Sequence, residues 1–125
     1  MSTKLTPHFS LEELTTTKTG ISNIPHENDI NQLRILCRDI LEPLREKIGK
    51  PIIVDSAFRS AAVNRAVGGV SNSQHLIGQA ADIHSSVQLS CLWNAIKSLV
   101  HNGSFNIGQC IWYPNKHFIH LSLRL

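Results

Sequence analysis

Residues 71–85 read SNSQHLIGQAADIHS, and this stretch changes character at Gly78. The residues before the glycine are mostly polar and predict a loop, whereas GQAADIH is rich in small and apolar residues and predicts a short buried strand. His75 and Asp82 stand on either side of the glycine, which permits a tight turn. A loop that doubles back here would aim both side chains at one point. The stretch therefore predicts two metal-capable residues where a loop enters a strand.

The chain N-terminal to this stretch is predicted to be largely helical. Ser10 followed by Glu13 forms a capping-box pattern, which predicts a short helix over residues 11–16. Apolar residues then recur in steps of three and four over residues 27–48, which predicts one long amphipathic helix. Pro43 should kink or split that helix, because proline lacks an N–H and its ring clashes with the preceding turn.

The other segments predict a sheet with helices around it. Hairpin-forming strands come last in the chain, so the sequence predicts a compact α+β domain with a largely antiparallel sheet flanked by helices. A second amphipathic helix is predicted over residues 85–103, with an inner face of Leu89, Leu92, Trp93, Ile96, Leu99 and Val100. The remaining predicted elements are strands over 52–58, 107–113 and 118–125, a helical turn over 61–67 capped by Ser60, and a turn at Pro114 and Asn115.

Size and composition predict one domain, residues 1–125, with a single modest core. Hydrophobic residues make up 42% and charged residues 17%, which is an ordinary globular balance. The formal charge of +3 is scattered, and no apolar run approaches the ~20 residues of a membrane span, so neither a nucleic acid nor a membrane is expected as partner. Three widely spaced cysteines predict buried free thiols.

A third candidate ligand is found in the last predicted strand. His120 is flanked by Ile119 and Leu121, and strand alternation places those two side chains on the opposite face. The His120 side chain could therefore point toward His75 and Asp82 from a neighbouring strand. Two imidazoles and a carboxylate with an open fourth position make a catalytic zinc site, in which zinc lowers the pKa of a water molecule toward ~7. The alternative is that the histidines are separate hydrogen-bonded residues and the aspartate is a cap.

Four segments of the chain resemble peptidase family M15. Residues 73–82, SQHLIGQAAD, match the S-x-H-x-x-G-x-A-x-D motif of the zinc D-Ala-D-Ala carboxypeptidases in that family. FIHLSL at 118–123 resembles the strand that carries the family's final metal histidine, and DSAFRSAAVNRAVGG at 55–69 resembles its S-G-Y-R-S-x-x-x-N segment. FSLEELTTTKTGISNIP at 9–25 resembles the opening of phage-type members. The resemblance covers nearly the whole chain and implies the compact α+β fold shared with the Hedgehog signalling domain.

The resemblance implies roles in metal and substrate binding for five residues. His75, Asp82 and His120 would be the zinc ligands. Arg59 matches the family arginine and would hold a substrate carboxylate or polarise the scissile carbonyl, which suits the fixed fork of a guanidinium. The alternative for Arg59 is a surface salt bridge. Ser73 would bind substrate or support the ligand two positions later.

His117 is the residue that the resemblance implies as general acid and base. Several relatives place a glutamate or a histidine three residues before the final ligand, and that position is His117 here. Residues three apart on a strand point to opposite faces. We therefore predict that the regular strand begins at about Phe118 and that a turn frees the His117 ring. The alternative is that His117 is an exposed turn residue without a role in catalysis. No acidic residue follows Asp82, so the C-terminal part of the chain offers no carboxylate as base.

The implied activity is zinc-dependent hydrolysis of peptidoglycan stem peptides, in the manner of a D-Ala-D-Ala carboxypeptidase. One alternative is an L-Ala-D-Glu endopeptidase, or endolysin, of the same family. The other is a catalytically silent zinc-binding structural module of a phage or prophage. The N-terminus lacks the apolar core of a signal peptide, so we expect the protein to be made in the cytoplasm. The resemblance implies a phage or prophage protein that acts at the bacterial cell wall, and we expect a monomer.

Overall fold

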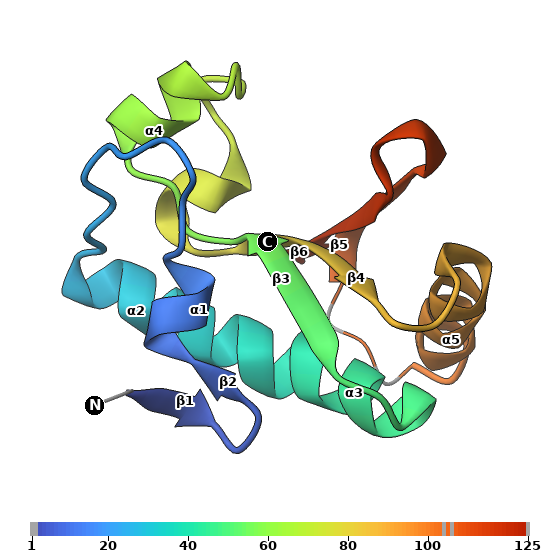
Figure 1. Ribbon diagram of the computed structural model, residues 1–125. Coiled ribbons are helices and arrows are strands. Elements are labelled where there is room, and N and C mark those ends of the chain that lie inside the picture. The colour runs from blue at the N-terminus through green and yellow to red at the C-terminus, as the bar shows by residue number, and fades with distance from the viewer. Residues whose placement is uncertain (1–2, 104, 106, 125) are drawn as a thin grey trace.

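A four-stranded antiparallel sheet forms the centre of the computed structural model, which describes residues 3–103, 105 and 107–124 (Figure 1). The strands lie in the order β3, β4, β6, β5, and each neighbouring pair is antiparallel. A separate ribbon near the N-terminus pairs β1 with β2. The strands are β1 (Lys4–Thr6), β2 (Phe9–Ser10), β3 (Ile52–Ser56), β4 (Ala80–Ser85), β5 (Ile107–Tyr113) and β6 (Phe118–Leu123). The predicted α+β class is confirmed.

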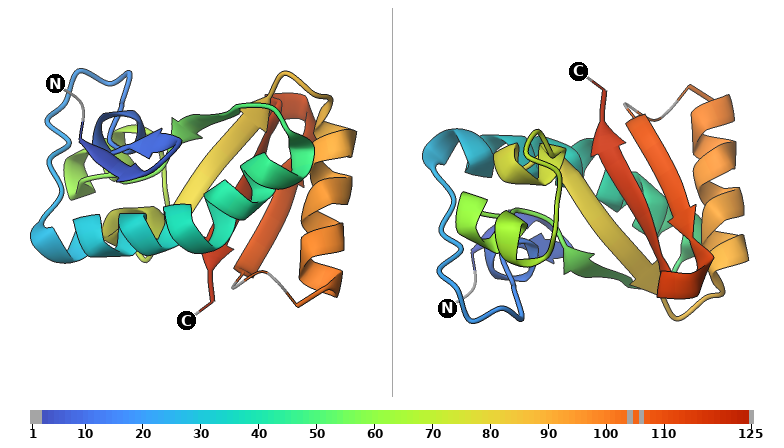
Figure 2. Two further views of the ribbon diagram at one scale, coloured as in Figure 1. Left: turned by 90° about the horizontal axis from the view of Figure 1, so that it is seen from below. Right: turned by 90° about the horizontal axis from the view of Figure 1, so that it is seen from above.

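Helices cover one face of the central sheet, and the long segment formed by α2, η1 and α3 crosses that face (Figure 2). Helix α5 packs against α3, β4 and β6. The shorter α4 and η2 lie at the other end of the molecule from α5 (Figure 1). No described helix is both long enough and apolar enough to span a membrane. The helices are α1 (Leu11–Leu14), α2 (Glu27–Leu36), η1 (Cys37–Leu41), α3 (Glu42–Ile48), α4 (Ala61–Ala66), η2 (Gln74–Ile77), α5 (Leu89–His101) and η3 (Pro114–Lys116).

The long helix predicted over residues 27–48 contains a π-helical turn at Cys37–Leu41. Pro43 is the second residue of α3, which follows immediately. In a regular α-helix its ring would clash with the carbonyl four residues earlier. A π turn shifts the hydrogen-bond register by one residue, and the first positions of a helical segment do not need the missing N–H. Pro43 therefore changes the local helix type, and the segment continues to Gly49, which ends it with a φ of 67°.

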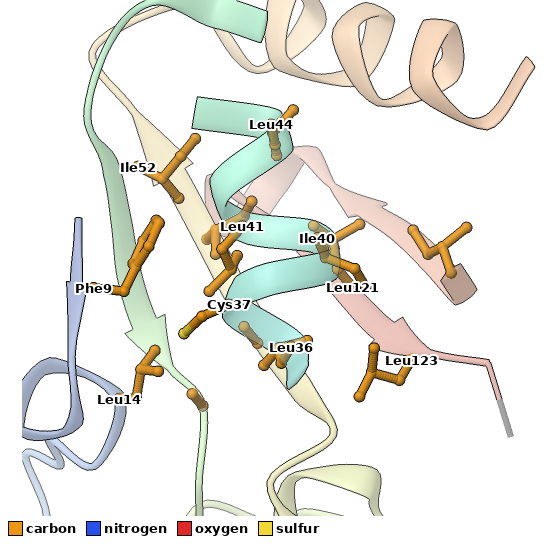
Figure 3. Close-up of a cluster of buried hydrophobic side chains, with 14 of the residues drawn as sticks. Phe9, Leu14, Leu36, Cys37, Ile40, Leu41, Leu44, Ile52, Leu121 and Leu123 are labelled. Carbon is orange, nitrogen blue, oxygen red and sulfur yellow. The ribbon is translucent and has the colours of Figure 1, made fainter. Parts of the chain in front are cut away.

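The core lies between this helix and the sheet (Figure 3). Leu36, Ile40 and Leu44 are fully buried on the inner side of the helix, where they belong to the same cluster as Leu121 of β6. Cys37 is also fully buried, and burial raises the pKa of its thiol to about 12. It therefore stays uncharged and packs as a small apolar residue. Burial on this face leaves the opposite face of β4 and β6 for polar residues.

Several local predictions need correction. The short N-terminal helix has the predicted capping box but ends at Leu14 instead of residue 16. Val100 is 47% exposed and not on the inner face of α5, because successive helical residues are about 100° apart and Leu99 already faces inward. The thiol of Cys91 is exposed, so burial was predicted wrongly for that cysteine, which precedes the buried Leu92. The segment predicted as loop over 70–77 contains the 3₁₀ turn η2.

Gly78 is expected to be essential for stability because a side chain there meets two obstacles. Its φ is +76°, and an added Cβ would lie 2.5 Å from the carbonyl oxygen of Asp29. Gly68 has the same φ but open space around the Cβ position, so it is a matched control. Gly68→Ala should lower the free energy of unfolding by about 1–2 kcal/mol, because of the left-handed backbone alone. Gly78→Ala should cost about 1–3 kcal/mol more, measured by urea unfolding, because the neighbouring helix must move. An equal loss of stability in the two variants would show that α2 moves aside without a cost in free energy.

Candidate metal centre

Three side chains from three separate elements converge on the sheet face that the helices leave open. His75 comes from η2, Asp82 from β4 and His120 from β6. Each offers one ligand atom, and these atoms all lie within 4.8 Å of one another. Asp82 and His120 are direct partners in the antiparallel pairing of β4 with β6, which places their side chains side by side. These are the three residues that the sequence predicts as a metal site, and the structure brings them together.

Local structure orients His75 toward the two strand residues. The Ser73 hydroxyl caps η2 and accepts a hydrogen bond from the backbone N–H of His75. The backbone carbonyl of His75 accepts one from the N–H of Arg59, which fixes η2 against the segment after β3. Gly78 ends η2 in the left-handed region and lets the chain turn directly into β4. These three features fix the loop and orient the imidazole toward Asp82 and His120. The tight turn at Gly78 agrees with the turn that the sequence predicts there.

Hydrogen bonding sets the tautomer of His75. Its Nδ1 lies 2.6 Å from the carbonyl oxygen of Ala57, and a carbonyl only accepts, so Nδ1 carries the proton. In the neutral ring, Nε2 then presents a lone pair toward Asp82 Oδ1, 3.3 Å away. A lone pair that faces a carboxylate oxygen needs a cation between them, either a proton or a metal ion. A backbone carbonyl that holds the outer nitrogen of a histidine is a common arrangement at metal sites.

The donor set fits zinc. In a tetrahedral site with ligand bonds of about 2.0–2.1 Å, neighbouring donor atoms are about 3.3 Å apart. His75 Nε2 and Asp82 Oδ1 are 3.3 Å apart, and His120 Nδ1 and Asp82 Oδ1 are 2.8 Å apart. Two imidazole nitrogens and one carboxylate oxygen leave the fourth position for a water molecule or a substrate oxygen. This separates the site from structural zinc sites, in which four protein ligands close the coordination.

Asp82 is ionised across the neutral pH range. Its burial raises the pKa of the carboxyl group, but the close contacts with His120 and His75 outweigh burial and lower that pKa to about 2. The Nη2 of Arg59 donates to Oδ2 at 3.3 Å and occupies the oxygen that faces away from the histidines. Oδ1 is therefore the oxygen that is left for a metal ion.

Arg59 is fixed by two further contacts. Its Nε donates to Ser56 Oγ at 3.1 Å, and its Nη1 donates to Asn64 Oδ1 at 3.3 Å. Asn64 is buried, and its amide nitrogen donates to the carbonyl of Val70. A Cβ at Gly69 would overlap Asn64 Oδ1, so this glycine permits the close approach of the Asn64 side chain.

Sequence reasoning did not find Ser56, Asn64 and Gly69 as parts of the site. They stand next to or within the segment that carries Arg59, and their spacing is ordinary for a loop and a helix. Only the fold of residues 56–70 brings these three residues close to the Arg59 guanidinium. The sole signal in the sequence is an Asn on a short helix followed by two glycines.

A cavity of about 570 Å³ opens over the three candidate ligands. Segment 67–74 forms one wall and includes Ser73, and the β5–β6 hairpin forms the other with Tyr113, Lys116 and Phe118 among its residues. Arg59 lines the same cavity. Among the described residues that line the cavity, Asp82 is the sole acidic one. The arrangement can hold a metal ion at its base and a polar ligand of moderate size above it.

His117 lies in the turn immediately before β6, with a φ of 59° in the left-handed region. Regular strand begins at Phe118, as predicted. The His117 side chain is exposed and does not belong to the residues that line the cavity, whereas both of its neighbours do. The structure therefore gives His117 no contact with the candidate ligands, and its role in proton transfer stays a prediction.

Comparison with known proteins gives two findings. The sequence profile of the family described as Peptidase M15 matches residues 7–122. A zinc D-Ala-D-Ala carboxypeptidase from Streptomyces albus G is 46% identical to this chain over 52 residues, which is 41% of this chain and 20% of the relative. The chain therefore matches about a fifth of the length of that relative.

Proposed function

The chain belongs to the peptidase M15 family, and from this premise we propose that it is a zinc D,D-carboxypeptidase that cleaves peptidoglycan stem peptides. The observation that carries the proposal is the convergence of His75, Asp82 and His120 at the base of an open cavity. The similar carboxypeptidase from Streptomyces albus G supports both the metal and the substrate class. We further propose the bacterial cell wall as the place of action, which follows from that substrate.

His75 Nε2, Asp82 Oδ1 and His120 Nδ1 would hold the zinc ion. When bound, zinc supplies Lewis-acid polarisation of a carbonyl and a lowered pKa for a water molecule. The chain contributes the geometry: Ala57 holds the outer nitrogen of His75, and Arg59 holds the outer oxygen of Asp82. These outer contacts fix the ligand orientation before substrate binds, so little reorganisation is needed.

Arg59 is suited to stabilise negative charge that develops on the scissile carbonyl oxygen. Its side chain is 15% exposed, lines the cavity and is bonded to Asp82 next to the candidate metal position. A guanidinium fixed by three protein contacts pays little entropy when it meets an oxyanion. Ser73 lines the same cavity and would contact the peptide from the opposite wall, although its hydroxyl also caps η2.

His117 is proposed to move the proton between the attacking water and the leaving amine. Support comes from its sequence position and from the left-handed turn that frees it from the strand pairing of β6. The exposed ring must swing inward to act. His117→Ala should keep zinc and fold but lower kcat by roughly a hundredfold, in line with loss of a general acid–base group. Steady-state kinetics on a zinc-saturated variant measure this, with His26→Ala, also exposed, as control.

An unchanged kcat in His117→Ala would remove this residue from the mechanism. Proton transfer would then fall to a group that already lines the cavity, of which the Tyr113 hydroxyl is the first candidate.

A second hollow favours an endopeptidase as the alternative function. Its volume is about 200 Å³, and it is lined by residues 16–19 together with Asp55 and Ser56. It shares Arg59 and Val67 with the main cavity, so the two hollows meet at these residues. A peptide that extended past Arg59 could continue into this hollow. If the part of the peptide C-terminal to the cleaved bond runs into this hollow, the site suits an endopeptidase, because a carboxypeptidase needs room for only one residue on that side.

Digestion of purified peptidoglycan with zinc-loaded protein tests the proposal. A D,D-carboxypeptidase should release free D-alanine and leave stem peptides shortened by one residue, identified by mass spectrometry. Cleavage inside the stem would support the endopeptidase. A parallel reaction with a zinc chelator should give no products. Intact peptidoglycan in the zinc-loaded reaction would contradict both activities and favour a zinc-binding module without catalysis.

A further inference from the structure

Arg59 has limited capacity to bind a substrate carboxylate. A guanidinium carries five N–H groups, and three nitrogens of Arg59 already donate to Ser56, Asn64 and Asp82. At most two N–H groups remain, one on each terminal nitrogen. The positive charge is also paired with the Asp82 carboxylate. Arg59 can still meet one oxygen of a reacting carbonyl, but a second cation is needed for a carboxylate.

Lys116 is the other lysine or arginine among the described residues that line the cavity. Within the described part of the chain it forms no ion pair, so its charge is uncompensated. Its Nζ lies 5.6 Å from the centre of the Tyr113 ring. A cation over an aromatic face is held in place while its N–H donors stay available. Lys116 therefore presents a positioned ammonium group on the wall of the cavity.

The hairpin around Lys116 adds an apolar surface. Tyr113 and Phe118 are register partners of β5 and β6, and their ring centres are 5.0 Å apart. Both residues line the same cavity as Lys116. A positive group beside two aromatic rings in contact suits a ligand that ends in a carboxylate on a small apolar residue. Figure 1 shows this hairpin on the opposite side of the molecule from the loop before α2, which contributes residues 16–19 to the second hollow.

We propose that Lys116 binds the C-terminal carboxylate of the peptide and so determines that the last residue is removed. The inference rests on the proposed peptidase function and specifies its substrate end. In a carboxypeptidase substrate the terminal carboxylate lies one residue beyond the attacked carbonyl, and successive Cα atoms are about 3.8 Å apart. The carbonyl belongs beside Arg59 and the candidate ligands. The carboxylate then needs a separate positively charged partner, and Lys116 lines the same cavity.

The test compares two peptides that differ only at the C-terminus: diacetyl-L-Lys-D-Ala-D-Ala and its C-terminal amide. KM and kcat are measured for both with zinc-loaded wild-type protein and with Lys116→Met. The variant should raise KM for the acid about tenfold, the effect of one charge-assisted hydrogen bond, and leave KM for the amide and both kcat values nearly unchanged. Lys116→Arg should restore the preference for the acid. Lys97→Met, on the exposed face of α5, controls for net charge.

Equal ratios of acid to amide KM in wild-type protein and Lys116→Met would overturn the inference while leaving the peptidase function intact. If wild-type protein hydrolyses neither peptide, the proposed function fails instead. The two intact peptides are then titrated into zinc-loaded protein by calorimetry. Tighter binding of the acid that is lost in Lys116→Met would still support the carboxylate site. No difference between acid and amide would overturn it.

Discussion

Replacing His75 with alanine is expected to lower zinc affinity by well over a hundredfold. Loss of an outer partner of a metal ligand already costs about 10–100-fold, and this change removes a ligand itself. The remaining donors, Asp82 Oδ1 and His120 Nδ1, are 2.8 Å apart and lie on adjacent strands. With two protein ligands, two coordination positions of zinc are left to water, so the protein contributes little to the binding free energy. Competition titration against a chromophoric chelator measures the affinity, and native mass spectrometry counts the bound ions.

His84→Ala is the matched control for this experiment. His84 stands on the same strand as Asp82, but its Nδ1 is 2.8 Å from Asp55 Oδ2 and it does not line the cavity. The variant should bind one zinc ion as the wild-type protein does. If His75→Ala also kept one equivalent at native affinity, the ligand assignment would be wrong, whatever the activity.

Arg59→Lys is expected to lower kcat by about 10²–10³, the effect of losing one preorganised oxyanion donor. A single ammonium group cannot replace three guanidinium nitrogens that contact Ser56, Asn64 and Asp82. The lysine would satisfy one of these partners and would not hold a fixed direction toward the substrate. Zinc stoichiometry should stay near one at saturating metal, because Arg59 is not a ligand. Kinetics and zinc content are measured on the same preparation.

Arg65→Lys provides the comparison for Arg59→Lys. Arg65 is exposed on α4 and does not line the cavity, so kcat should not change. Thermal unfolding of both variants separates a loss of activity from a loss of fold. A wild-type kcat in Arg59→Lys would restrict Arg59 to holding Asp82.

Hydrophobic periodicity and terminal signals predicted most of the secondary structure. The capping box at Ser10, the cap at Ser60 and the left-handed Gly49 act within a few residues, so the sequence displays them directly. The sequence could not predict which change in helix geometry Pro43 would cause. A proline in a helical pattern can be met by a break, a kink or a π turn, and tertiary packing of Leu36, Ile40 and Leu44 keeps this helix continuous.

The candidate ligands were accessible to sequence reasoning for a specific reason. His75 and Asp82 share one short segment around Gly78, and His120 sits between two apolar residues of a strand. These features alone left separate hydrogen-bonded histidines as an alternative, and the resemblance to the M15 motif favoured the zinc site. The surroundings of the ligands were not accessible, because they depend on non-local pairing. Nothing near Asn64 indicates a bond to Arg59, and nothing near Lys116 shows that the β5–β6 hairpin forms a wall of the cavity. The order β3, β4, β6, β5 is what brings these segments together.

The central claim is that zinc binds between His75, Asp82 and His120. Anomalous scattering from crystals of zinc-loaded protein, recorded on both sides of the zinc absorption edge, tests it most directly. The account predicts one anomalous peak within about 2.0–2.2 Å of His75 Nε2, Asp82 Oδ1 and His120 Nδ1. A peak elsewhere, for example between His84 and Asp55, or no peak among these three side chains at saturating zinc, would contradict it.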